Sequence, residues 1–517
     1  MNDNLSPALT RRSMLGGTLA LGGFLLVGCG TDNSSSPGGG NGSPVKTLRV
    51  GVTGDLLLSS IQRFQANNQM LRRTVYDYLL DKSDDGSYTP SLATAWKWSS
   101  DQKSLVITLR DDVKYHTGRA FGPDDVIASA NAALVATSGA QAAGLLKLAS
   151  GLKKTGDNEV TATFDKPFPG YLDAFAMLPI IDSQTYADAP SGKQVIGTGP
   201  YTFGSWTAGS KYTLKRNPSY WQSGKPAFDT IEVTVITDSQ AMLSALQSGQ
   251  LDMVDGMVLR DAATLKKSGK FTVQTSATYD IYVGVNTKVK PLDDVRVRQA
   301  IAYALDRDRI SSQVYSGLAA ASCVPWPSNA PGVTQEQVKH YSYDLAKAKS
   351  LLQQAGAVGT EIELAPIPSD PSVVAASQIV QYGLTQAGFK VKMGTYDSAA
   401  FATHVQAGDF PGLWITNVAL TTMGATTALL TANPLTSAKN TENFVTPEYA
   451  SLVSAVVDAT TDKLPAATAA LTDYMLEQAF HNTLVQGQTP VVAVPGLSGV
   501  TVDRTLAVNL TNATLKE

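Results

Sequence analysis

Hydrophobic and polar residues alternate along some stretches of this chain and recur with a helical period along others. The alternating runs at residues 104–110 (SLVITLR) and 159–164 (EVTATF) predict half-buried strands. Between them, residues 123–134 place their apolar side chains on one helical face. This stretch begins Pro-Asp-Asp, with a proline in the first turn and acids near the positive helix end, so a helix is expected to start at Pro123.

The same two patterns continue along the rest of the chain. Residues 48–52 (LRVGV) predict a first strand, and helical spacing predicts helices at 68–80, 239–248, 295–310 and 344–355. Further on, a strand (361–367), a helix (373–387) and a second strand (389–396) form a βαβ unit, which requires a right-handed crossover between parallel strands. Mixed strands and helices with such a unit indicate an α/β chain.

The N-terminus has the features of an export signal. Arg11 and Arg12 precede an apolar run at residues 14–27, which is shorter than the ~18–20 residues of a membrane-spanning helix. The paired arginines resemble a twin-arginine signal. The run Leu-Val-Gly-Cys ending at Cys29 resembles the lipobox of bacterial lipoproteins, which implies that Cys29 becomes the lipidated first residue of the mature chain. An ordinary signal with an incidental cysteine, or a membrane anchor, are the alternatives.

After Cys29, residues 30–44 (GTDNSSSPGGGNGSP) are polar and rich in glycine and serine. Such a segment cannot bury enough apolar surface to fold, so it is expected to be a flexible tether between a lipid anchor and a folded body. The body contains no second apolar run long enough to span a bilayer. We therefore expect it outside the membrane, in the cell envelope and held at the outer face of the cell membrane.

Charge and cysteine content narrow the possible partners. The net charge is −3 and no Lys/Arg cluster occurs, which argues against nucleic acid as a partner. If Cys29 carries lipid, Cys323 has no cysteine partner. Its neighbours Val324, Pro325 and Trp326 predict a small, buried apolar filler rather than a nucleophile.

Motifs for catalysis or metal binding are absent from the sequence. Histidines stand far apart, outside any HExxH frame, at His116, His340, His404 and His481. We therefore expect no metal site and no cofactor. No GxSxG elbow occurs, so no catalytic residues are assigned, although triads assemble in space rather than in sequence. Residues 197–200 (GTGP) predict a turn, because Pro200 removes a donor that a phosphate loop would need.

Several segments together resemble one family, the extracellular solute-binding proteins of family 5, which are the oligopeptide, dipeptide and nickel receptors of ABC importers. The matching segments are residues 88–98 (YTPSLATAWKW), 101–110 (DQKSLVITLR), 112–118 (DVKYHTG), 123–126 (PDDV), 196–201 (IGTGPY), 214–221 (LKRNPSYW), 246–252 (LQSGQLD), 291–307 (PLDDVRVRQAIAYALDR) and 346–356 (AKAKSLLQQAG). The resemblance spans about residues 46–415, and the order of the segments makes coincidence improbable. Most of these motifs are expected to specify the fold, with Arg296 and Arg298 pairing with acids.

The resemblance implies a two-lobed clamp of the periplasmic-binding-protein type, class II, that closes on a solute and performs no chemistry on it. Expected boundaries are a signal peptide at 1–28, the tether at 29–44, lobe I at 44–286 with an inserted subdomain at about 86–195, lobe II at 287–488, and a C-terminal return to lobe I at 489–517. A monomer that captures a peptide or peptide-like solute and delivers it to ABC permease subunits is expected. A nickel chelate, oligosaccharide, siderophore or opine are the alternative solutes, and an exported α/β hydrolase or a non-transporting receptor are the alternative roles.

In this family, ligand contacts come from loops at the ends of the strands that face the cleft. The corresponding positions are Thr53, Gly54 and Asp55 after the first strand, Tyr396 after the βαβ unit, and Trp414 and Asn417. In many peptide-binding members, an Asp three residues after the Trp pairs with the α-ammonium of the peptide. Here that position is Asn417, whose neutral amide cannot neutralise a buried cation. The resemblance therefore implies recognition of a free peptide N-terminus only where a nearby Asp takes the place of this residue.

Overall fold

The computed structural model describes residues 46–516, with gaps at 64–67, 84–85, 136–137, 139, 421–422, 461 and 504–505. The chain divides into two units, Met1–Pro44 and Val45–Glu517, and the fold described below is that of the second. Cys29, the predicted signal and the predicted tether lie outside the described residues. Among the described helices, none combines the length and the apolar character that crossing a bilayer requires.

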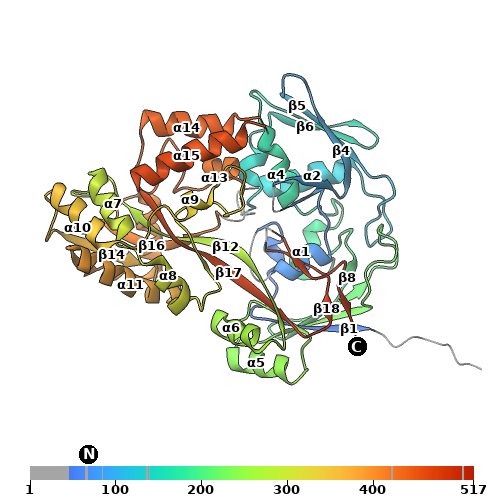
Figure 1. The fold of residues 1–517 in the computed structure, drawn as a ribbon. Helices are drawn as coiled ribbons and strands as arrows, with labels where there is room; N and C mark the ends of the chain where they lie inside the picture. Colours follow the sequence, from blue (N-terminus) through green and yellow to red (C-terminus); the bar gives the residue numbers. More distant parts are fainter. Residues whose placement is uncertain are drawn as a thin grey trace, which may run out of the picture. The chain divides into compact units, whose positions relative to one another are not determined.

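A large mixed β-sheet runs through the described part of the chain (Figure 1). Its strands, in spatial order, are β15 (Lys390–Met393), β14 (Glu361–Pro366), β16 (Leu413–Val418), β12 (Thr272–Val285), β17 (His481–Ala493), β11 (Met253–Asp255), β1 (Thr47–Val52), β10 (Thr230–Val235), β9 (Lys211–Arg216) and β8 (Tyr201–Thr207), with β13 (Ala320–Ala321) paired to β17. We call the part built on β1 and β8–β11 lobe I, and the part built on β14–β16 lobe II.

The long strands β12 and β17 join the two lobes. They pair antiparallel from Thr272 opposite Ala493 to Gly284 opposite His481. β11 of lobe I pairs with one end of β17, and β16 of lobe II pairs with the opposite end of β12. The register shifts at two places between these ends, between Ala277 and Tyr279 and between Ile281 and Tyr282. This two-strand connection is the part of the sheet that belongs to both lobes.

Lobe I carries an additional layer with its own core. A four-stranded antiparallel sheet of β4 (Ala93–Trp98), β5 (Ser104–Leu109), β7 (Glu159–Thr163) and β6 (Gly151–Gly156) packs against α2 (Pro123–Leu134), α3 (Ala143–Leu146) and α4 (Leu172–Met177). The short pair β2 (Leu80–Lys82) and β3 (Tyr88–Pro90) lies beside α4. The C-terminal pairs β18 (Leu497–Ser498) with β21 (Thr514–Leu515), and β19 (Thr501–Val502) with β20 (Val508–Asn509), add side chains to the core of lobe I.

Helices cover the strands of lobe II and begin where the sequence supplies a cap. α7 (Val295–Tyr303), α10 (Leu345–Gln354), α11 (Pro371–Ala387) and α12 (Ser398–Ala407) each follow an aspartate whose carboxylate accepts a first-turn backbone N–H. The remaining α-helices of the described chain are α1 (Gln69–Thr74), α5 (Ser239–Gln247), α6 (Leu259–Ser268), α8 (Arg307–Arg309), α9 (Gln335–Val338), α13 (Ala425–Thr431), α14 (Pro447–Val457) and α15 (Leu464–Gln478). Short 3-10 helices lie at Leu58–Ser60, Pro169–Tyr171 and Tyr186–Ser191, and a short π-helix lies at Ile310–Val314.

The strongly periodic segments are predicted correctly. β1, β5, β7, α2, α5 and α10 form within a residue or two of the expected bounds. β14 and β15 are parallel, with α11 between them in the chain, which confirms the predicted βαβ unit and the α/β class.

Two predicted helices are wrong in extent. The helix expected at 68–80 ends at Thr74, because the Val75 carbonyl accepts a hydrogen bond from Gly199 N (2.9 Å) instead of a helical partner. A Cβ on Gly197 would lie 2.0 Å from that carbonyl oxygen, so the GTGP turn needs glycine to approach so closely. The helix expected at 295–310 breaks after Tyr303, whose carbonyl accepts from Asp344 N, and restarts behind Asp306 as α8.

Candidate functional site

A cavity of about 290 Å³ lies where lobe I meets lobe II. Lobe I contributes residues from β2, β3 and α4, and lobe II contributes residues before α9 and around α13 and α15. Its principal side chains are Lys82, Tyr88 and Asp173 from lobe I, and Trp326, Pro331, Met423 and Leu464 from lobe II. Its volume is close to the lower end of the range for small-molecule sites, and its walls come from distant parts of the chain.

The polar side of the cavity is built around the buried carboxylate of Asp173. Its Oδ1 accepts from the ammonium of Lys82 and from the Tyr88 hydroxyl (2.6 Å), and its Oδ2 accepts from the Thr427 hydroxyl (2.8 Å). Burial alone would raise the pKa of Asp173, but the Lys82 charge and these hydrogen bonds outweigh it and lower the pKa. Asp173 therefore stays ionised and has its charge balanced within the protein.

The bond from Thr427 to Asp173 crosses between the lobes. Thr427 belongs to α13 of lobe II and Asp173 to α4 of lobe I, and both side chains are buried. Nearby, a Cβ on Gly144 would lie 2.5 Å from the Thr431 methyl group, so α3 and α13 pack closely. Because Asp173 is already satisfied, the remaining surface of the cavity suits an uncharged, largely apolar group.

The first three predicted contact residues follow β1 in lobe I. Thr53 is exposed, and Gly54 and Asp55 are half-buried. The carboxylate of Asp55 accepts from Trp206 Nε1 (2.9 Å) and Gly209 N (2.7 Å), so it holds the β8–β9 hairpin against this loop. Within the described chain, none of the three lines the cavity between the lobes.

The other predicted contact residues lie in lobe II, also outside that cavity. Trp414 is fully buried and stacks on Phe410 with ring centroids 5.3 Å apart. A Cβ on Gly284 would lie 2.2 Å from its ring, so the neighbouring strand must have glycine there. The Tyr396 hydroxyl donates to Glu363 (2.6 Å) next to Phe410.

Asn417 is half-buried, and its side-chain amide donates to Asp370 Oδ2 (3.2 Å). The structure thus brings Tyr396 and Trp414 into one aromatic cluster and places Asn417 on the same strand as Trp414. As ligand contacts, all six residues stay predictions.

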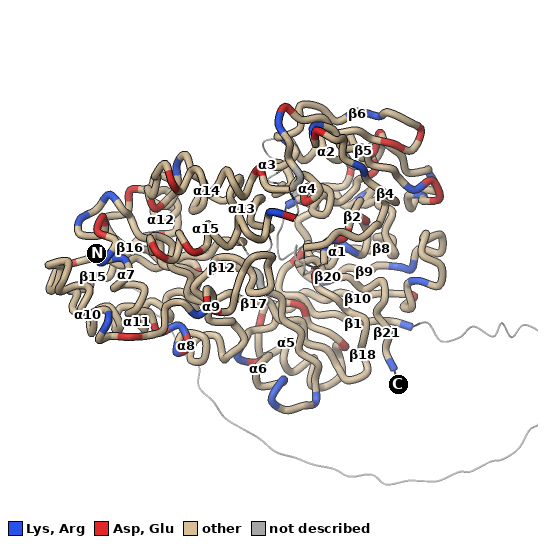
Figure 2. Tube along the Cα trace, turned by 45° about the horizontal axis from the view of Figure 1, so that its top comes forward, with Lys and Arg blue, Asp and Glu red and all other residues tan. Residues whose placement is uncertain are grey.

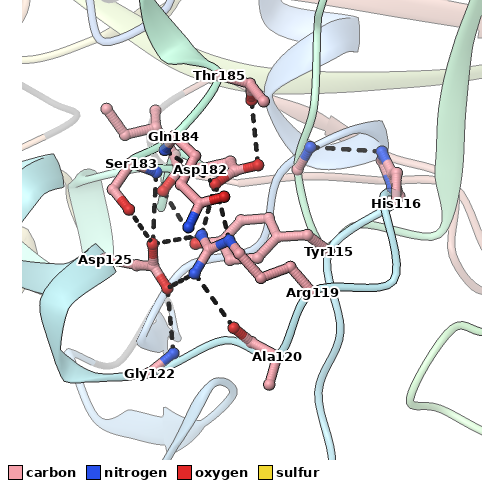
Figure 3. A network of polar contacts seen from close by, with 12 residues as sticks. Tyr115, His116, Arg119, Ala120, Gly122, Asp125, Asp182, Ser183, Gln184 and Thr185 are labelled. Atoms are coloured by element: carbon pink, nitrogen blue, oxygen red, sulfur yellow. Dashed lines mark hydrogen bonds and ion pairs between the residues drawn. The ribbon is translucent and has the colours of Figure 1, made fainter.

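The polar motifs near Asp125 and His116 mostly hold the fold together. Figure 3 shows Asp125 of the PDDV segment receiving hydrogen bonds from Arg119, Ser183 and Gly122 N, while Arg119 also pairs with Asp182. Beside this network, His116 is half-buried between Gly197 and Gly199, and loss of solvent contact lowers its pKa to about 4. These side chains thus have hydrogen-bond partners within the protein.

The expectation for the two arginines of the 291–307 motif is confirmed for one and wrong for the other. Arg296 pairs with Asp294. Arg298 is buried and donates instead to the backbone carbonyls of Leu292, Asp293 and Gln478.

Cys323 is buried, as predicted, with its Sγ facing the Tyr341 backbone. Among the described residues, no group of three potential ligands is arranged for a metal ion. Acidic and basic positions are interspersed over both lobes (Figure 2).

This chain is similar in sequence to proteins that are already known. Residues 87–432 match the family described as bacterial extracellular solute-binding proteins, family 5 Middle. The chain belongs to this family. A dipeptide-binding protein of Escherichia coli K12 is 30% identical over 357 residues, which is 62% of this chain and 65% of that relative. A glutathione-binding protein of Pectobacterium atrosepticum is 26% identical over 370 residues, 69% of this chain and 70% of its own length.

The fold of family 5 is also found among solved structures. HbpA2 from Haemophilus parasuis superposes with a TM-score of 0.79, covers 91% of this chain and 100% of its own, and is 23% identical. This likeness confirms the two-lobed clamp expected from the sequence. The match to the Escherichia coli relative spans under two thirds of that protein's length. These family 5 relatives are binding proteins rather than enzymes.

Sequence reasoning missed the residues that line the cavity. Tyr88 lies within a recognised motif, but its motif gives no reason to place it opposite lobe II. Asp173 and Thr427 lie in segments without a family signature. Their contact joins residues separated by 254 positions, and no local pattern encodes such a contact.

Proposed function

We propose that this protein is a lipid-anchored receptor that captures a peptide or peptide-like solute between its lobes and delivers it to the permease subunits of an ABC importer. The observation that carries the proposal is the cavity built from both lobes and bridged by Asp173 and Thr427. A solute held there touches both lobes, so its binding favours the closed arrangement. The permease then distinguishes a loaded receptor from an empty one by its closed surface.

The hinge is proposed to lie in β12 and β17. Both strands have ladder irregularities between the lobe I end and the lobe II end, at Ala277/Tyr279 and Ile281/Tyr282. Such irregularities interrupt ladder hydrogen bonding and let strands bend. The lobe boundaries expected at 286/287 and 488/489 remain part of this proposal.

The solute class is proposed from relatives and from the cavity together. Relatives in Escherichia coli and Pectobacterium atrosepticum are named for a dipeptide and for glutathione, which is itself a peptide. The apolar walls from Trp326, Met423 and Leu464 suit a side chain or another uncharged part of such a solute.

Anchoring through Cys29 and the segment 30–44 completes the proposal. A receptor on a flexible tether stays close to its permease, and the tether length sets its effective concentration there. Export and lipidation follow from the signal, lipobox and tether patterns of residues 1–44.

Calorimetry with a peptide library, followed by small-angle scattering on any peptide that binds, tests the clamp. We expect saturable binding without turnover and a smaller radius of gyration with peptide bound. A ligand that raises the melting temperature but leaves the radius of gyration unchanged contradicts the clamp mechanism. Absence of any bound peptide contradicts the solute class, and mass spectrometry of co-purified small molecules then identifies the true class.

A further inference from the structure

Lys82 is the only cation among the described residues that line the cavity between the lobes, and Asp173 is the only anion. Lys82 ends strand β2 of lobe I, and its side chain is 16% exposed. Its ammonium donates to Asp173 Oδ1 and lies 5.2 Å from the centre of the Tyr88 ring. The cavity therefore contains one ion pair within a largely apolar wall, and the cation is the more exposed member of that pair.

The two members of this ion pair differ in the hydrogen bonds that they can still form. Asp173 Oδ1 already accepts from Lys82 and Tyr88, and Asp173 Oδ2 accepts from Thr427. An ammonium group has three N–H donors. Within the described chain, Asp173 is the one hydrogen-bond acceptor of Lys82, so two donors of Lys82 remain. The ion pair therefore offers hydrogen-bond donors to a solute rather than acceptors.

Gly424 of lobe II leaves this ion pair uncovered. It precedes α13 with an extended backbone, at φ −70° and ψ 158°, which residues with a side chain also adopt. A Cβ at this position would lie 3.2 Å from Lys82 Nζ and 3.1 Å from Asp173 Oδ2. The backbone therefore does not require glycine here, but any side chain at this position would crowd the Lys82 ammonium.

The charges of the cavity select against a charged group of the solute. A solute ammonium would lie beside the Lys82 ammonium, and like charges repel. A solute carboxylate would add a second negative charge close to Asp173, where Lys82 is the only described cation in the wall. Burying a charge without its own counter-ion is costly. A neutral oxygen, such as the carbonyl oxygen of an amide, accepts from Lys82 without that cost.

We propose that Lys82 is a specificity-determining residue of the solute site and donates a hydrogen bond to an uncharged oxygen of the solute, an amide carbonyl. This inference rests on the proposed function and names the chemistry of the solute in this cavity. The bound part of the solute is an uncharged peptide-like segment, with its hydrocarbon against Trp326, Met423 and Leu464. Charged peptide termini are not needed for binding there.

The first experiment compares two thermolysin digests of casein. One digest is untreated, and the other has its amines acetylated and its carboxyl groups methyl-esterified. The purified full-length chain is incubated with each digest, and retained peptides are identified by mass spectrometry. We expect wild type to retain peptides from the blocked digest as well as from the untreated one. A retained blocked peptide is then synthesised as the probe for variants.

Gly424→Ala tests access of the solute to the Lys82 ammonium. We expect calorimetry to show that this variant binds the probe peptide about tenfold more weakly than wild type, because the added methyl group crowds the donors. Gly122→Ala is the matched control. Gly122 also precedes a helix with an extended backbone, and a Cβ there would have no atom within 4 Å. Its affinity for the probe peptide is expected to equal that of wild type.

The double variant Lys82→Met/Asp173→Asn tests the hydrogen bond itself. It removes both charges together, so neither is left buried without its partner. The probe peptide is also prepared with a thioamide at each position in turn, because sulfur is a weaker hydrogen-bond acceptor than oxygen. One thioamide is expected to weaken binding to wild type several-fold and to leave binding to the double variant unchanged. A residue that only shapes the cavity would not couple to a single carbonyl in this way.

The outcomes separate this inference from the function on which it rests. Retention of peptides from the untreated digest alone overturns the role of Lys82 while peptide binding stands. An unchanged affinity of Gly424→Ala, or thioamide losses that are equal in wild type and in the double variant, overturns it as well. Retention of no peptide from either digest overturns the peptide function and this inference together.

Discussion

His481 is a buried histidine held between two carboxylates. Its Nε2 lies 2.7 Å from Asp280 Oδ2 and its Nδ1 lies 3.3 Å from Glu442 Oε1, and its ring stacks on Tyr282. Burial lowers the pKa of His481, but hydrogen bonds and charge attraction from Asp280 and Glu442 raise it overall, to about 9. His481 lies on β17 and Asp280 on β12, so the contact between their side chains joins the two strands near their lobe II ends.

The His481 cluster makes stability depend on pH above neutrality. The pKa of His481 in the folded state is about 9, above the ordinary value near 6.5, so its contribution is complete below pH ~6.5 and is lost as pH rises through 9. The loss is expected to be at most about 3 kcal/mol. Urea unfolding at pH 6, 7.5 and 9 measures it.

His481→Gln is the comparison variant for that measurement. It is expected to be about 3–5 kcal/mol less stable at pH 6, since it leaves two buried acids without a cation. Between pH 6 and 9 the free energy of unfolding of this variant should lack the decline that wild type shows. Parallel stability curves for the two proteins would disprove the charged state of His481.

At the scale of elements, α13 meets α4 through the bond from Thr427 to Asp173. Thr427→Val keeps the shape of the side chain and removes this donor. Hydrogen bonds to charged groups contribute about 1.5–3 kcal/mol to stability. Because Thr427 and Asp173 belong to different lobes, this bond stabilises the arrangement in which the lobes are in contact. We expect the dissociation constant for a bound peptide to rise at least tenfold, measured by calorimetry.

Thr431→Val is the control on the same helix. Its hydroxyl donates within α13 to the Thr427 carbonyl, while its methyl group faces Gly144 and is kept in valine. Its affinity for peptide should stay near that of wild type. An equal loss of affinity in both variants would point to damage of α13 rather than to a contact between lobes.

Elements with a strong local pattern could be predicted, and elements shaped by distant contacts could not. α2 has both its proline start and its apolar face within twelve residues of sequence. α1 stops early because Gly199, far along the chain, binds the Val75 carbonyl. α7 stops because Asp344 binds the Tyr303 carbonyl. In both of these helices a tertiary hydrogen bond replaces a helical one. The periodicity of apolar residues cannot predict such a tertiary hydrogen bond.

At the scale of the whole molecule, the family motifs predicted two lobes but not the groups between them. The segment 246–252 draws attention to Asp252, which the structure shows paired with Arg49. Asp255, three residues later, is buried without a side-chain partner among the described residues, and only the packing of β1, β9 and β11 makes that visible. Whether a carboxylate has a charged partner depends on its neighbours in space. The sequence alone therefore could not show that Asp252 is paired and that Asp255 is not.

The proposed lipid anchor on Cys29 leads to a prediction of where the protein resides. Cys29→Ser removes the atom that carries the proposed lipid, so the protein should move from the membrane pellet to the soluble exported fraction. Peptide affinity should not change, because residues 30–44 separate Cys29 from the folded unit that begins at Val45. Uptake of peptide at low concentration should fall, since the free receptor no longer has a raised effective concentration at the permease.

Cys323→Ser is the control. That thiol is buried in lobe II, so its replacement should leave the amount of protein in the membrane fraction unchanged. A Cys29→Ser protein that stays in the pellet after a carbonate wash would show that something other than a lipid on Cys29 anchors the chain.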